Sequence, residues 1–227
     1  NLGGSLAVAD TWTSTSTSIS LTTDNASLSS TVALSLASLQ TNGYDFELAS
    51  ATSDLTIENA FALSVGETLS TQGADLIFEG SVTTSSISTI DAGDGGMLEF
   101  QNGGTASGTI NAENATFKIG SAYAVTGTLK TNSSTTWDLA SNLDLSGGTL
   151  VLGGNPVVLD QVLTDNQTTF KLGEDTTVTR NQGFTLGSLD LDNSTLTLGS
   201  ATTDLTIDIG DSSDNGTDSG SPPGTLA

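Results

Sequence analysis

Residues 98–129 read LEFQNGGTASGTINAENATFKIGSAYAVTGTL, and this stretch decides the fold. Three of its positions recur nineteen residues later, so three separate steps along the chain have the same length. A coil of a repeating structure that is one residue shorter than its neighbours would shift all three positions together. The matched positions are Leu98 and Phe117, Gly104 and Tyr123, and Ile110 and Leu129.

The same period runs through most of the chain. Large apolar residues fall into three interleaved series, with steps of 18 to 22 residues. Several early steps share one value, 21, which accidental spacing would not produce. The first series is Leu28, Leu48, Leu69, Ile90, Ile110, Leu129, Leu150, Phe170, Leu189 and Ile207; the second is Leu34, Leu55, Leu76, Leu98, Phe117, Trp137, Val157, Val178 and Leu196; the third is Phe61, Val82, a gap at Gly104, Tyr123, Leu143, Leu163, Phe184 and Leu205.

Around each apolar position the local period is two, as in Leu55-Thr56-Ile57 and Phe117-Lys118-Ile119, which is typical of a short strand with one buried face. Turn-forming pairs such as Asn42-Gly43 and Gly147-Gly148 separate these strands. Three strands in about 20 residues predict an all-β fold, a right-handed parallel β-helix (β-solenoid) of roughly nine coils. An antiparallel β-sandwich would also alternate, but it would not share a phase of 19 or 21 residues.

The two ends of the chain differ from its middle. Residues 1–27 include a polar, strand-prone stretch, and we expect an N-terminal cap or a strand donated to a neighbour. Residues 28–209 carry the repeat and predict the solenoid. Residues 210–227 are rich in Gly, Asp, Ser and Pro and predict an acidic tail or linker. The chain begins at Asn1 without a charged-then-apolar leader, so we expect a processed product or a part of a longer protein.

The charge balance excludes several partners. Four Lys and Arg stand against 26 Asp and Glu, a formal net charge of −22, so neither nucleic acid nor an anionic membrane surface is an expected partner. No apolar run is long enough for membrane insertion. Cysteine is absent, which favours a secreted, extracellular protein of an organism that does not rely on disulfides.

Catalysis has few suitable side chains here. The chain has neither His nor Cys, which removes the usual general base, thiol nucleophiles and common zinc sites. A polysaccharide lyase needs cations, and the only ones are scattered. A glycoside hydrolase needs two carboxylates, and among 26 acidic residues such a pair is expected by chance, so its presence carries no information. We therefore expect no enzyme and no catalytic residues. The four cations are Lys118, Lys130, Lys171 and Arg180.

Calcium is the strongest chemical hypothesis. Asp outnumbers Glu by 19 to 7, and short carboxylates in turns suit oxygen coordination. The predicted metal ligands are Asp208, Asp211, Asp214 and Asp218, within eleven residues of each other. Smaller clusters lie at Asp190, Asp192 and Asn193 and at Asp91 and Asp94. The alternative is that these are solvated acidic turns and a solvated tail.

The Thr-Xaa-Thr stretch from Thr11 to Thr17 raises an ice-binding alternative, in which threonines on a flat face order water. That function needs the pattern once per coil on one face. Here the pattern is packed into a single segment, which argues against it.

Residues 189–199, LDLDNSTLTLG, and 145–154, LSGGTLVLGG, carry a family resemblance. Such runs resemble the parallel β-helix passenger domains of bacterial autotransporters and large repetitive adhesins such as filamentous haemagglutinin-like proteins. The resemblance covers most of residues 28–209. It implies secretion, attachment and a fibre-like architecture, and it carries over no functional residue because the shared pattern is structural.

We therefore expect an extracellular structural or adhesive module of the cell surface, of the kind found in biofilms. Its expected partners are copies of itself, joined end to end or by strand donation, or other surface proteins. A solenoid ends in open strand edges that can pair with a further strand. The alternatives are a carbohydrate-binding or carbohydrate-cleaving β-helix, with glycans as partners, and a calcium-stiffened spacer of a giant adhesin.

Overall fold

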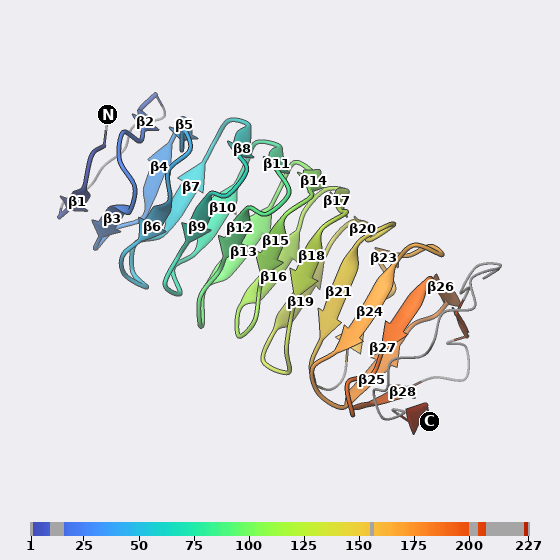
Figure 1. The fold of residues 1–227 in the computed structure, drawn as a ribbon. Helices are drawn as coiled ribbons and strands as arrows, with labels where there is room; N and C mark the ends of the chain where they lie inside the picture. The colour runs from blue at the N-terminus through green and yellow to red at the C-terminus, as the bar shows by residue number, and fades with distance from the viewer. Residues whose placement is uncertain (1, 10–15, 155–156, 200–203, 208–224, 227) are drawn as a thin grey trace.

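Short strands follow one another around a rod, and each pairs with a strand about 20 residues away in the sequence (Figure 1). This computed structural model describes residues 2–9, 16–154, 157–199, 204–207 and 225–226. Every strand pair in these ranges is parallel, which confirms the predicted β-solenoid. Within them, no helix has the length and apolarity needed to cross a bilayer.

Three sheets run along the rod and give it a prism-like cross-section. The long sheet has ten strands, so the solenoid has about ten turns, one more than the nine predicted. Its strands, in spatial order, are β1 (Ser5–Val8), β3 (Ala26–Ser30), β6 (Phe46–Leu48), β9 (Thr68–Ser70), β12 (Thr89–Asp91), β15 (Thr109–Asn111), β18 (Thr128–Lys130), β21 (Thr149–Leu152), β24 (Thr169–Leu172) and β27 (Ser188–Asp190).

The second and third sheets have six strands each. The second sheet contains β4 (Leu34–Leu36), β7 (Leu55–Ile57), β10 (Leu76–Phe78), β13 (Met97–Phe100), β16 (Thr116–Ile119) and β19 (Thr136–Leu139). The third sheet contains β8 (Phe61–Leu63), β11 (Val82–Thr84), β14 (Gly104–Ala106), β17 (Tyr123–Val125), β20 (Leu143–Asp144) and β23 (Val162–Leu163).

Smaller sheets continue the stack at both ends. Near the N-terminus, β2 (Ser18–Ser20) pairs with β5 (Ser38–Gln40). Near the C-terminus, one sheet contains β22 (Val157–Val158), β25 (Thr176–Thr179), β28 (Thr195–Leu198) and β30 (Thr225–Leu226), and another contains β26 (Phe184–Leu186) and β29 (Leu205–Ile207).

The described parts of both end segments pair with the solenoid of their own chain. Within residues 1–27, β1 pairs with β3 and β2 pairs with β5. Within residues 210–227, only β30 is described, and it pairs with β28. The stack of strands therefore begins before residue 28.

The predicted apolar series are confirmed where their shared phase was clearest. The second series is a single column of paired residues from Leu34 to Trp137. The first is confirmed from Leu69 to Leu189, and the third from Phe61 to Leu143. These columns face inward, and stacking seals them from water because no coil can bury its own apolar face alone.

Three register predictions are off by two or more residues. Phe46, not Leu48, pairs with Leu69, and Val178 pairs with Leu198 instead of Leu196. A slip of two residues leaves every side chain on its original face, so alternation alone cannot detect it. Ile207 pairs with Leu186, in a different sheet from the first series.

One prediction is off by a single residue, which reverses the face. Val162, not Leu163, pairs with Leu143. Val162 is fully buried and Leu163 is 40% exposed. The sequence offers two adjacent aliphatic residues at this point, and only the pairing of the strands chooses between them.

An aromatic stack fills the middle of the core. The rings of Phe61, Phe78, Phe100, Phe117 and Trp137 follow one another at centroid distances of 5.2 to 6.0 Å. The Tyr123 ring lies 4.4 Å from that of Phe100, and burial raises the pKa of its hydroxyl. Aromatic pairs at such distances contribute about 0.5–1.5 kcal/mol each beyond the area that they bury.

The gap at Gly104 in the third series has a steric cause. Gly104 has a φ of 140°, and the backbone of Val82 occupies the space that a Cβ would need. Only glycine combines this backbone conformation with so close an approach of the neighbouring coil.

Candidate functional site: carboxylate turns and a threonine column

The predicted calcium ligands Asp208, Asp211, Asp214 and Asp218 all lie outside the described residues. Their positions relative to one another are therefore not described, and this site stays a prediction. The two smaller acidic clusters lie within the described ranges. Each can be compared with what an ion would require.

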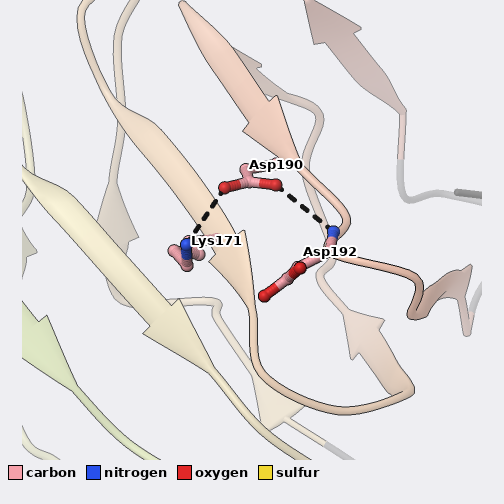
Figure 2. Close-up of polar contacts among 3 residues, drawn as sticks. All are labelled: Lys171, Asp190 and Asp192. Atoms are coloured by element: carbon pink, nitrogen blue, oxygen red, sulfur yellow. Dashed lines mark hydrogen bonds and ion pairs between the residues drawn. The ribbon is translucent and has the colours of Figure 1, made fainter. Parts of the chain in front are cut away.

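In the first cluster, Asp190 already has two partners (Figure 2). One carboxylate oxygen lies 3.2 Å from Lys171 Nζ on the neighbouring coil, and the other accepts a hydrogen bond of 3.2 Å from the backbone N–H of Asp192. Both side chains of the ion pair are about half exposed, so the pair contributes at most about 1 kcal/mol. The arrangement is an ion pair that fixes a turn, with the cation supplied by the protein.

The second cluster is a ladder of carboxylates and amides at one corner of the prism. Asp91 accepts hydrogen bonds from Gly93 N and Asn111 Nδ2, at 3.1 and 3.2 Å. Asp94 accepts one of 2.9 Å from Asn114 Nδ2. The Asn114 side-chain oxygen in turn accepts one of 2.8 Å from Asn132. Adjacent coils are thus linked by amides that donate and oxygens that accept.

This corner lines a shallow surface hollow of about 340 Å³ that also contains Glu113 and Gln72. Nevertheless, in the described ranges, no three His, Cys, Asp or Glu side chains are grouped closely enough to hold a metal ion. The hollow can hold water and small polar groups. Its carboxylates serve to tie one coil to the next.

Glu67 is a buried carboxylate that sequence reasoning missed. It is 1% exposed, and its oxygens accept hydrogen bonds from Thr41 Oγ1 at 2.7 Å, from Ser64 N at 2.5 Å and from Gly43 N. The carboxylate thereby satisfies backbone donors from the turns of two coils. No period in the sequence marks it, because it occurs in one turn only.

The four cations are dispersed, as the sequence indicates. Lys118 Nζ lies 3.3 Å from a Glu99 oxygen on the second sheet, and Lys130 and Lys171 lie on the long sheet. Arg180 is 7% exposed, with its guanidinium 5.8 Å from the centre of the Phe184 ring. Burial lowers the pKa of Arg180, and the nearby Asp160 carboxylate opposes that shift.

The second sheet ends at β19, although the predicted series continues from Trp137 to Val157. Strand β22 belongs to another sheet, and a hollow of about 310 Å³ lies here, lined by Trp137, Leu139 and Val158 among others. In the preceding coil, Thr136 N donates to Ala115 O. The residue twenty positions later is Pro156, which has no N–H to donate. A proline at this point in the sequence could have indicated the end of the sheet, which the apolar series did not predict.

A column of threonines runs along the outer face of the long sheet. Six successive strands present a threonine at the same outward position, and each pairs directly with the next. All six are half-buried. The threonine column consists of Thr68, Thr89, Thr109, Thr128, Thr149 and Thr169.

The column was not predicted from the sequence, because the predicted series contain apolar residues only. Each of its members directly precedes a residue of the first apolar series. The Thr11–Thr17 stretch, which suggested ice binding, lies mostly outside the described residues.

Comparisons with protein-family models, with curated proteins and with solved structures gave no match to this chain.

Proposed function

We propose that this chain is a structural or adhesive module of an extracellular surface, a rigid rod that spaces or joins other components and assembles end to end. The observation that carries the proposal is the unbroken ten-stranded sheet along the rod. At about 4.8 Å per strand, it makes a rod about 48 Å long. Secretion and resemblance to bacterial β-helix adhesins belong to the same proposal and are supported by composition and repeat pattern.

The pattern of bonding in the turns supports a mechanical role. Corner side chains such as Asp94, Asn114 and Glu67 bond to neighbouring coils. Side chains committed to holding the rod together resist its bending and local opening. A rod of this kind works through its length and its ends.

The N-terminal end offers an edge for assembly. Strand β1 is the outermost strand of the long sheet, and within the described residues no strand covers its outer side. Ser27 N donates to Gly4 O, so Gly4, Leu6 and Val8 face β3. In a parallel ladder alternate residues face opposite neighbours, so the N–H groups of Ser5 and Ala7 point outward. A strand from a second copy would bond there.

The Ala7→Pro variant tests this edge. Proline removes the outward N–H and leaves the bonds from β1 to β3 in place. We expect the wild-type chain to form filaments in electron microscopy and sedimentation, and Ala7→Pro to remain as single rods. Deletion of residues 1–27 should also abolish the filaments. Ala7→Thr is the matched control, since it keeps the N–H and suits a strand, and it should polymerise like the wild type.

Filaments of equal length from Ala7→Pro would overturn end-to-end pairing at β1. Single rods of the wild type at every concentration would overturn assembly as the function. Release of reducing ends from a polysaccharide by the purified chain would favour the carbohydrate-cleaving alternative instead.

A further inference from the structure

We infer that the threonine column is a lateral contact surface, on which a second copy of this chain packs face to face. The inference deepens the proposed function, because lateral pairing would bundle the rods. It uses a different surface from end-to-end assembly, so each can fail separately.

The hydroxyls of the column are not used by the fold. Within the described part of the chain, none of the six hydroxyl groups forms a hydrogen bond with another residue, although the hydroxyls of several other threonines do. Thr71, Thr131, Thr135 and Thr168, all at corners, donate to backbone carbonyls of neighbouring coils. The fold therefore uses threonine hydroxyls at its corners and leaves those of the column available to a partner.

Strand propensity does not account for the column either. Threonine favours strand positions in general, so the outward columns of the other sheets should be equally rich in it if propensity were the cause. The outward column of the third sheet instead reads Ala62, Thr83, Thr105, Ala124 and Asp144. That of the second sheet reads Ser35, Thr56, Ile77, Glu99, Lys118 and Asp138. Among the outward columns of these three sheets, as far as the chain is described, only that of the long sheet repeats one residue over six coils.

The spacing of the column favours a second copy as its partner. Threonines on adjacent strands recur at about 4.8 Å. Another copy has the same repeat, so two facing columns stay in step along their whole length, whereas a partner with another repeat drifts out of step. Identical side chains stacked in this way interdigitate into dry contacts between paired sheets, as in steric zippers.

The charges beside the column also favour this face. The next outward column contains Lys130 and Lys171, half of the cations in a chain of net charge −22. The same column contains Glu47, Asp91 and Asp190, so three acids stand beside two cations, and opposite charges of two copies can face each other across a two-fold axis. A nearly balanced column repels a second acidic rod less than a wholly acidic surface would.

The area predicts a weak contact for one pair of rods. Ten strands of three to five residues present a face of about 550 Å² per partner, at the low end for a specific interface. Lateral pairing should therefore depend on concentration and strengthen when rods are joined end to end, because the contacts then act together.

A cysteine scan tests the contact, because the native chain has no cysteine. Each threonine of the column is replaced singly, as in Thr109→Cys and Thr128→Cys, and disulfide-linked dimers are followed under mild oxidation. Thr83→Cys and Thr105→Cys are the controls, since these outward positions on the third sheet are more exposed and random collision favours them.

We expect at least one column position to cross-link ten-fold or more faster than both controls. If the two rods are antiparallel, with the two-fold axis perpendicular to them, only one column position faces its own copy and cross-links fast. If they are parallel, with the two-fold axis along them, all six positions face their own copies and cross-link fast. Adding two glutamates elsewhere in the column, such as Thr89→Glu and Thr149→Glu if Thr128→Cys is the fast variant, should abolish the fast reaction. Uniformly slow cross-linking would overturn the inference, as would a monomeric chain whose column shapes growing ice crystals. If Ala7→Pro alone prevents filaments while the scan is flat, the proposed function stands and the lateral contact falls.

Discussion

Ile87 has a backbone conformation that β-branched residues rarely adopt. Its φ is 57°, and its side chain is 76% exposed. One coil earlier the same corner position is Gly66, with a φ of 83°. The left-handed conformation costs an L-residue about 1–2 kcal/mol, and an exposed side chain buries little to offset it.

The Ile87→Asn variant should therefore be more stable than the wild type, by about 1 kcal/mol in chemical denaturation, because asparagine tolerates this conformation. Val65→Asn is the matched control: Val65 is 61% exposed at the neighbouring corner and has no positive φ. It should change the stability by less than about 0.5 kcal/mol. Equal effects from both variants would show that exposure, and not the backbone, sets the difference.

Two aspartates should affect the pH dependence of stability in opposite directions. Burial, together with the Asp54 carboxylate, raises the pKa of Asp75 above its usual 3.8. The folded state then binds more protons than the unfolded state, so Asp75 lowers stability as pH rises from about 3.8 through the raised pKa. Hydrogen bonds from Gln167 N and Gly147 N lower the pKa of Asp165. Asp165 therefore adds stability above 3.8, which is lost as pH falls through its lowered pKa.

Asp75→Asn should accordingly raise the melting temperature at pH 7 and have less effect at pH 3. Asp165→Asn should lower the melting temperature at pH 7 and have less effect well below pH 3. Melting curves across this range distinguish the two cases. A decrease for Asp75→Asn at pH 7 would mean that its bond to Met97 N outweighs the repulsion from Asp54.

At the scale of elements, a strand is defined by its partner more than by its own residues. Phe46 and Leu48 both face inward, and only the pairing of β6 with β9 selects Phe46 as the partner of Leu69. The conformation of a turn likewise depends on side chains from neighbouring coils. The turn between β5 and β6 and the turn between β8 and β9 share the Glu67 carboxylate.

Glu67→Ala should destabilise the rod by about 3 kcal/mol, because it leaves buried backbone donors without acceptors. Glu67→Gln should cost less, since it keeps one oxygen. Glu79→Ala, at an exposed position, should be near neutral in the same urea titration. A near-neutral Glu67→Ala would mean that water replaces the carboxylate in this turn.

At the scale of the whole molecule, a formal net charge of −22 is concentrated on a narrow rod, so its acidic side chains repel one another. Calcium is a cation that such a rod could recruit, and the predicted ligands lie near its C-terminal end in sequence. We expect millimolar calcium to raise the melting temperature more than magnesium at equal ionic strength. Replacing Asp208, Asp211, Asp214 and Asp218 by Asn should abolish the difference.

Asp91→Asn with Asp94→Asn is the matched control for that experiment and should keep the calcium effect, because hydrogen bonds already occupy these carboxylates. No difference between calcium and magnesium in the wild type would remove the calcium-stiffened spacer. A calcium effect that survives the fourfold substitution would place the site elsewhere.

The sequence by itself determined that this chain is a parallel solenoid of about 20 residues per turn. Each coil buries an apolar residue at the same position, so apolar residues recur in the sequence at the length of one coil, as from Leu98 to Phe117 to Trp137. The apolar pattern did not predict the end of the second sheet at β19, because its series continued to Val157.

Only the tertiary structure decided the register where two apolar residues compete, as at Val162 and Leu163, because the choice depends on the strand opposite. It also revealed the carboxylate of Glu67 shared between turns and the six threonines on one face. These features depend on which residues of different coils become neighbours, and that is settled by strand pairing across the whole rod.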